Sequence, residues 1–95
     1  MLKISKSKSS EKKVTLLLEG RISNHGTEQL SGLCEEILAQ GNHLTLDFSG
    51  VSFVSWKGVG VLQHFERRQV ALVNCSGFVA EQLKIRKSEK QDSRM

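Results

Sequence analysis

The alternation of extended and helical segments is the feature that most limits how this chain can fold. Apolar residues, alternating or in short runs, mark extended segments at 1–7, 13–19, 44–48 and 70–73. They recur at helical spacing at 27–40, at 57–68 and after Ser76. A helix between two strands of one sheet makes a right-handed crossover that leaves the strands parallel. The order ββαβαβα therefore predicts an α/β fold: a mixed four-stranded sheet, made of an N-terminal hairpin plus parallel strands, with three helices packed largely on one face.

The length of 95 residues, 38% of them hydrophobic, allows one domain with a single modest core. We expect residues 1–85 to form this domain. We expect residues 86–95 to form a disordered basic tail, because the apolar signal stops after Lys84. No apolar run approaches the ~20 residues that cross a bilayer, and the N-terminus lacks the apolar stretch of a secretory signal. These observations predict a cytoplasmic protein without direct membrane insertion.

Local signals predict how the first crossover is built. The run Val14–Leu18 is almost continuously apolar, which is typical of a strand that is covered on both faces. Residues 21–26 are expected to form a loop. Thr27 is a candidate N-cap for the first helix, and Gly41 is placed to end that helix in a left-handed turn.

The second half of the chain repeats the pattern. Residues 49–55 are expected to form a connection that still buries Val51 and Phe53. Ser76 is a candidate cap for the third helix, which is expected to turn three apolar side chains inward: Phe78, Val79 and Leu83. In such sheets, ligands and partners are found at the carboxyl ends of the parallel strands. The segments that meet there are predicted to be 21–26, 49–57 and 74–77.

The charge distribution argues against a nucleic-acid-binding domain, although the net charge is +4. Residues 1–13 carry a net charge of +4 and residues 84–95 carry +3, whereas residues 14–83 carry −3. A nucleic-acid-binding domain collects its basic residues on one structured face. Here the expected folded body is acidic and only its ends are basic, so we expect no nucleic-acid partner.

No pattern of catalytic or metal-binding residues stands out. Cys34 and Cys75 form neither a metal-binding spacing nor a CxxC pair, and both are expected to be small buried hydrophobes. His25, His43 and His64 stand far apart and are expected in surface or loop positions. No nucleophile–base pair, phosphate-binding lysine loop or suggestive carboxylate pair is found. The sequence predicts a non-enzymatic protein with no metal and no other cofactor.

The segment 44–62 resembles the STAS domain of anti-sigma factor antagonists. The residues that match the family pattern of strand, turn and helix are Asp47, Phe53, Val54, Gly58, Gly60 and Leu62. Further matches are Leu18-Glu19-Gly20 after the second strand and the strand Val70–Asn74, so that the resemblance covers roughly residues 1–85. It implies that Asp47 orders the loop that follows it. We expect Gly58 and Gly60 to let the start of the next helix pack close to the sheet.

The chain departs from this family at its functional centre. In members that act as phosphorylation switches, a serine at the start of this helix accepts phosphate. The matching residue here is Trp56, and the acidic position before it holds Ser55. Indole has no hydroxyl, so we expect no switch at residue 56, and Ser55 is the candidate for a shifted phosphoacceptor. Trp56 is either an exposed anchor for a partner or a core residue that packs over Phe53 and Phe65.

The resemblance implies a protein partner, which is an anti-sigma factor or a regulatory kinase. We expect this partner to contact residues on two segments: Ser23, Asn24, His25, Ser55, Trp56, Lys57 and Gly58. STAS domains also accompany ABC-type lipid transporters and anion transporters, so the alternative partner is a transporter ATPase. Homodimer formation is left open.

Overall fold

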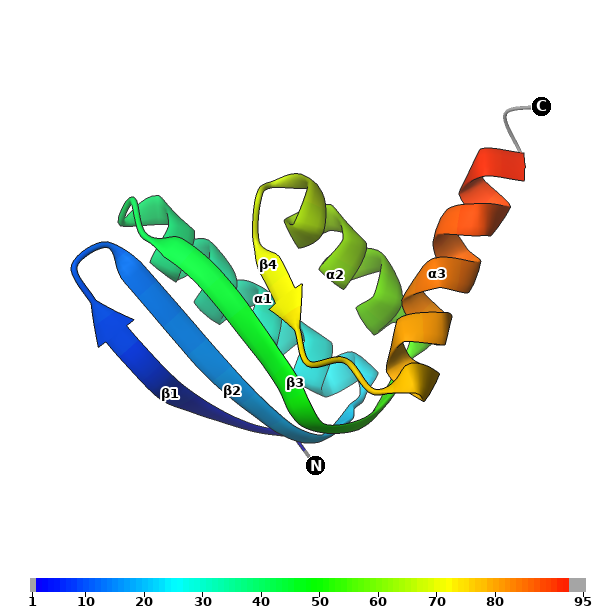
Figure 1. The fold of residues 1–95 in the computed structure, drawn as a ribbon, viewed down its shortest axis with the longest axis horizontal. Helices are drawn as coiled ribbons and strands as arrows, with labels where there is room; N and C mark the ends of the chain where they lie inside the picture. Colours follow the sequence, from blue (N-terminus) through cyan, green and yellow to red (C-terminus); the bar gives the residue numbers. More distant parts are fainter. Residues whose placement is uncertain (1, 93–95) are drawn as a thin grey trace.

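The computed structural model describes the backbone of residues 2–92 and the side chains of residues 2–84 except Lys8. Its elements follow the predicted order (Figure 1): β1 (Leu2–Ser10), β2 (Lys13–Ile22), α1 (Asn24–Ala39), β3 (His43–Val54), α2 (Trp56–Arg67), β4 (Ala71–Val73) and α3 (Gly77–Asp92). The sheet has the order β1-β2-β3-β4, in which β1 and β2 are antiparallel and the other pairs are parallel. The predicted α/β fold with a mixed four-stranded sheet is confirmed.

The helices α1 and α2 lie on one face of the sheet, and α3 stands on the β4 side (Figure 1). Alternating residues of β2, namely Val14, Leu16 and Leu18, are buried. Thr15 and Leu17, which point to the other face, are only half-buried. The expectation that this strand is covered on both faces was therefore wrong for Val14–Leu18, because α1 and α2 cover only the face of Val14, Leu16 and Leu18.

Aliphatic and aromatic side chains fill the core between the sheet and the helices. Phe48 of β3, Phe65 of α2 and Leu30 of α1 are each at most 1% exposed. Burying a side chain of this size stabilises the fold by about 1.5–3 kcal/mol. Cys34 is completely buried among them as predicted, and this burial raises the pKa of its thiol to about 12. Cys75 is only half-buried.

Strand β3 is longer than expected. Most of the predicted connection at residues 49–55 is part of the strand, which continues to Val54. Its register against β2 shifts twice: Leu17 pairs with Asp47 but Glu19 with Gly50, and Gly20 pairs with Val51 but Arg21 with Phe53. Each shift places one extra residue in β3. Such bulges bend a strand without ending its pairing. Val51 is buried as expected, and Phe53 is half-buried.

The start of α1 also differs from the prediction. Ser23, and not Thr27, is the N-cap: the Gly26 amide donates a hydrogen bond of 3.1 Å to Ser23 Oγ. Thr27 lies inside the helix, where its buried hydroxyl donates to the Ser23 carbonyl over 2.7 Å. The predicted loop at 21–26 therefore shrinks, since β2 ends at Ile22 and α1 begins at Asn24. Gly41 ends the helix with a φ of +83°, as expected.

The third helix is capped by Ser76, whose Oγ accepts a hydrogen bond of 3.2 Å from the Val79 amide. Val79 and Leu83 are buried as predicted, but Phe78 was wrongly placed inward, since it is 59% exposed.

The backbone remains helical to Asp92, although a disordered tail was expected from residue 86. Residues 93–95 of the expected tail lie outside the described residues, and the domain limit at 85 stays a prediction.

Candidate functional site

Two strand-to-helix junctions of the same design meet at one edge of the sheet. β2 enters α1 through Ile22-Ser23-Asn24-His25-Gly26, and β3 enters α2 through Val54-Ser55-Trp56-Lys57-Gly58. The parallel pairing of β2 and β3 places both junctions side by side, and the Ser55 amide donates a hydrogen bond of 2.8 Å to the Ile22 carbonyl. The first turns of α1 and α2 thus form one surface. We call it the helix-start surface, and its residues are Ser23, Asn24, His25, Glu28, Ser55, Trp56 and Lys57.

Ser55 is the N-cap of α2. Its Oγ accepts a hydrogen bond of 3.1 Å from the Gly58 amide, and its carbonyl accepts one of 2.9 Å from the Val59 amide. The geometry copies that of Ser23 in α1. Both hydroxyls satisfy amides that the first turn of a helix would otherwise leave unpaired.

Replacing Ser55 with alanine should lower the free energy of unfolding by about 1 kcal/mol, which is the usual value of a serine N-cap. Chemical denaturation of the wild type and the variant measures this difference. Ser23→Ala should cost a similar amount, and Ser9→Ala on the exposed β1 is the control. A change below about 0.3 kcal/mol in Ser55→Ala would mean that the cap contributes little.

Gly58 is buried where the start of α2 packs against α1 and the end of β3. A Cβ atom at this position would lie 2.8 Å from Val54 Cγ1 and 2.9 Å from Thr27 Oγ1. The expectation that Gly58 lets the helix start pack close to the sheet fits this geometry. Because Gly58 is buried, it shapes the helix-start surface from below and offers a partner no side chain.

Trp56 is the first residue of α2, and 56% of it is exposed. This exposure decides between the two interpretations left open by the sequence, and the core interpretation was wrong. The indole projects from a helix terminus whose backbone is fixed by the Ser55 cap and by pairing with β2. A large amphipathic side chain on a rigid base is typical of residues that dominate protein interfaces.

An ion pair joins the first turns of the two helices. Lys57 Nζ lies 2.9 Å from Glu28 Oε2, and both side chains are about half exposed or more. The hydrogen bond from Lys57 and the charge of Lys57 lower the pKa of the Glu28 carboxyl below its ordinary value. A pair this exposed adds little stability, but in this structure it places the Lys57 ammonium over the first turn of α1. Asn24 and His25 lie beside it, exposed in the first turn of α1.

Gln82 of α3 holds the end of β3, which the sequence did not predict. Its Oε1 accepts a hydrogen bond of 3.1 Å from the Val54 amide, and its Nε2 donates one of 2.7 Å to the Val54 carbonyl. The side-chain amide of Gln82 thus bonds Val54 as the backbone of a neighbouring strand would. A second glutamine, the buried Gln63 of α2, donates a bond of 2.7 Å to the Leu83 carbonyl. These contacts fasten α3 to the end of β3 and to the body of α2.

Asp47 orders the bulge that follows it, as the resemblance implied. Its Oδ1 accepts a hydrogen bond of 2.9 Å from the Ser49 amide. This bond, together with hydrogen bonds from the Asn74 and Ser49 side chains, lowers the pKa of the Asp47 carboxyl. The carboxylate is therefore ionised and used structurally at neutral pH.

Acidification should remove part of the stability that Asp47 provides. Because its folded-state pKa lies below the ordinary value of 3.8, the contribution is complete above that value and is lost as the pH falls through the lower folded-state pKa. We expect the unfolding free energy to fall less steeply below about pH 4 in Asp47→Asn than in the wild type, measured by urea denaturation. Glu36→Gln, which removes an exposed carboxylate from α1, is the control. Equal slopes in wild type and Asp47→Asn would contradict this assignment.

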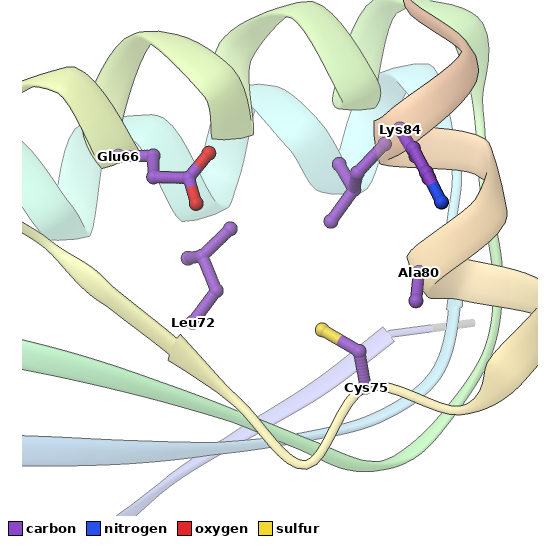
Figure 2. A pocket seen from close by; sticks show the side chains of 6 residues that line it. Glu66, Leu72, Cys75, Ala80 and Lys84 are labelled. Atoms are coloured by element: carbon purple, nitrogen blue, oxygen red, sulfur yellow. The ribbon is translucent and has the colours of Figure 1, made fainter. Parts of the chain in front are cut away.

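A separate pocket of about 230 Å³ lies between β4, α2 and α3. Figure 2 shows the Cys75 thiol pointing into it, and the full lining is Glu66, Leu72, Cys75, Ala80, Leu83 and Lys84. Burial and the negative charge of Glu66 raise the pKa of this thiol, which disfavours the reactive thiolate. Glu66 is in the last turn of α2, at the opposite end of the helix from Trp56, so the pocket is not part of the helix-start surface.

Within residues 2–92, no group of three or more His, Cys, Asp or Glu side chains is placed to hold a metal ion. The three histidines are all exposed. None of the helices described here is both long enough and apolar enough to span a bilayer. What the helix-start surface offers is a rigid backbone, one large aromatic side chain and charged neighbours.

Comparison with known proteins agrees with this architecture. Residues 5–86 match the family model described as "Mlab, STAS domain". The unphosphorylated form of the anti-sigma factor antagonist SpoIIAA has a similar structure, with a TM-score of 0.70 and 21% sequence identity over 83% of this chain and 79% of that chain. An uncharacterised Shewanella loihica protein with a SpoIIAA-like fold gives a TM-score of 0.56 at 15% identity, over 81% of this chain and 70% of that one.

No curated protein sequence matches the chain. The two structural likenesses, at 21% and 15% identity, show the fold. The family match extends over most of the chain and includes both strand-to-helix junctions. The chain therefore belongs to the STAS domain family.

Proposed function

We propose that this chain is a non-enzymatic module that binds one protein partner through the helix-start surface, with Trp56 as the anchor. The observation that carries this proposal is that Trp56, the first residue of a capped helix, is 56% exposed. Tryptophan is among the residues that contribute most to interface energies. The same surface also carries exposed polar side chains, as the rim of an interface does: Lys57, Glu28, Asn24 and His25.

Binding in this proposal does not depend on a phosphate at residue 56, because the indole accepts none. Ser55 is the nearest hydroxyl, and it is already engaged as the cap of α2. A phosphate there would be favoured by the positive end of the helix, so Ser55 is the position at which a shifted switch would be found. Mass spectrometry after incubation with a partner kinase tests this: stoichiometric phosphate on Ser55 or Ser52 would contradict binding without a switch.

Two classes of partner are proposed. The first is a kinase or anti-sigma factor, in line with the likeness to SpoIIAA. The second is the ATPase of an ABC-type transporter, with which STAS domains also occur. Trp56 favours the second class, because a permanent aromatic anchor suits a constitutive subunit better than a phosphate-controlled one. A cytoplasmic location and the lack of a cofactor or a nucleic-acid partner belong to the same proposal.

The experiment is an isothermal titration calorimetry measurement. The purified chain is titrated with purified candidate partners of both classes, encoded in the same genome. Wild type should bind a member of one class, and Trp56→Ala should weaken that binding. Val73→Ala, which shortens an exposed apolar residue of β4, is the control and should bind as wild type. Equal affinity of wild type and Trp56→Ala, or binding to neither class, would refute the proposal.

A further inference from the structure

The helix-start surface is too small to be a whole interface. A specific protein interface buries about 800 Å² and 20–30 residues on each partner. A partner that holds Trp56 must therefore contact more of the chain. Among the described residues, the exposed large hydrophobic side chains besides Trp56 are Val73 of β4 and Phe78 of α3. Phe78 is the more exposed of the two, at 59% against 37%.

Phe78 is part of a stack that starts next to the helix-start surface. Its ring centroid lies 6.4 Å from that of Phe53, with an interplanar angle of 26°. The guanidinium carbon of Arg21 lies 4.6 Å from the centroid of Phe53. Arg21 is two residues before Ser23, and Phe53 is two residues before Ser55. We call these three residues the α3 stack.

The glutamine contacts fix the α3 stack relative to Trp56. Gln82 bonds both backbone groups of Val54, which lies between Phe53 and Ser55. Gln82 is also one helical turn after Phe78 on α3. Trp56 and Phe78 therefore project from backbone segments that are joined by direct hydrogen bonds, which limits how far the two segments can move relative to each other before a partner binds.

We propose that the partner surface continues from Trp56 onto the first turn of α3, with Phe78 as a second aromatic contact and Arg21 as a contact for a carboxylate of the partner. Gln82 is a positioning residue that holds the two aromatic side chains in register. This inference rests on the proposed function. The occupant is a segment of the same protein partner, in which an Asp or Glu lies next to an apolar side chain.

The chemistry of Arg21 is the reason for the carboxylate. A guanidinium that stacks on a ring keeps its N–H edge free for a bidentate bond to a carboxylate. The ion pairs formed by the described side chains join Lys3 to Glu19, Lys57 to Glu28 and Arg68 to Glu35, and Arg21 takes part in none of them. An acidic group of a partner would complete this contact beside the apolar face of Phe78.

The first test uses the protein partner that binds wild type in the titration above. Phe78→Ser and Arg21→Gln should each weaken binding about tenfold. The salt dependence of binding should fall in Arg21→Gln alone. Val73→Ser and Arg67→Gln, which change an exposed apolar residue and an exposed arginine outside the α3 stack, are the matched controls and should bind as wild type. Circular dichroism confirms that each variant is folded.

The outcomes separate this inference from the proposed function. If Trp56→Ala weakens binding and Phe78→Ser does not, the extension onto α3 is wrong and the proposed function stands. If neither variant weakens binding, both are wrong. If Phe78→Ser weakens binding and Arg21→Gln does not, the carboxylate contact is wrong.

The positioning role of Gln82 has its own readout, because Trp56 is the single tryptophan of the chain. Gln82→Met, which keeps the length but loses both hydrogen bonds, should lower the fluorescence anisotropy of Trp56 well below the unfolding temperature. Gln29→Met on the exposed face of α1 is the control. Gln82→Met should also weaken partner binding about fivefold, and this loss should vanish in the Trp56→Ala background. Additive losses, or an unchanged anisotropy, would overturn the positioning role.

Discussion

Replacing Gly58 with alanine should lower the free energy of unfolding by about 2 kcal/mol, and the midpoint of thermal unfolding by roughly 10 °C. The added Cβ would lie 2.8 Å from Val54 Cγ1 and 2.9 Å from Thr27 Oγ1. Neither neighbour can move freely, because Val54 is held by Gln82 and the Thr27 hydroxyl donates to the Ser23 carbonyl. The helix would have to shift away from the sheet. Differential scanning calorimetry measures the change.

Gly32 offers a matched control in the middle of α1. A Cβ at Gly32 would meet no atom within 4 Å, and the residue is exposed. Gly32→Ala should therefore raise the free energy of unfolding by roughly 0.5–1 kcal/mol, because alanine is the better helix former. The same substitution should thus have opposite signs at the two positions. A stabilising effect of Gly58→Ala would show that the junction has room, and the packing argument would fail.

Replacing Trp56 with alanine should weaken partner binding by about 2 kcal/mol, or roughly thirtyfold, and leave the fold almost unchanged. The indole is 56% exposed in the free chain, so its removal leaves no large cavity. Its contribution arises when a partner buries the exposed part. Binding is measured by calorimetry, and stability by chemical denaturation of the same two proteins.

Comparing the two measurements separates an anchor from a structural residue. For an anchor, the affinity falls while the free energy of unfolding changes by less than about 0.5–1 kcal/mol. A buried tryptophan would instead cost ~3–5 kcal/mol of stability when truncated. A loss of stability in that range would contradict the exposed position of Trp56.

The order of elements could be predicted because it depends on local periodicity. Strand alternation and helical spacing are properties of neighbouring residues, and the chain keeps them throughout. The boundaries that failed depend on contacts between elements. Ser49-Gly50 has the composition of a turn, yet Gly50 continues β3. A Cβ at Gly50 would lie 2.8 Å from Glu19 Cγ on β2, so the glycine is where the two strands approach closely. The close approach of two strands cannot be read from either strand alone.

One missed boundary did have a signal in the sequence. An apolar residue followed by Ser-x-x-Gly occurs after β2 and again after β3, and in both places the serine caps the helix through the glycine amide. Comparing the two segments would have identified Ser23 instead of Thr27. The side-chain contacts that build the site had no such signal in the sequence. Gln82 lies 28 residues from Val54, and Lys57 lies 29 residues from Glu28. Only the folded chain brings these residues together.

The order of the strands in the sheet has a consequence for how the chain folds. Each strand pairs with the strand that precedes it in the sequence, from β1 to β4. Because every pairing joins strands that are neighbours in the sequence, no loop longer than one helical crossover has to close, which limits the entropy lost in closing loops. During synthesis the sheet can therefore add its strands in chain order, all at one edge.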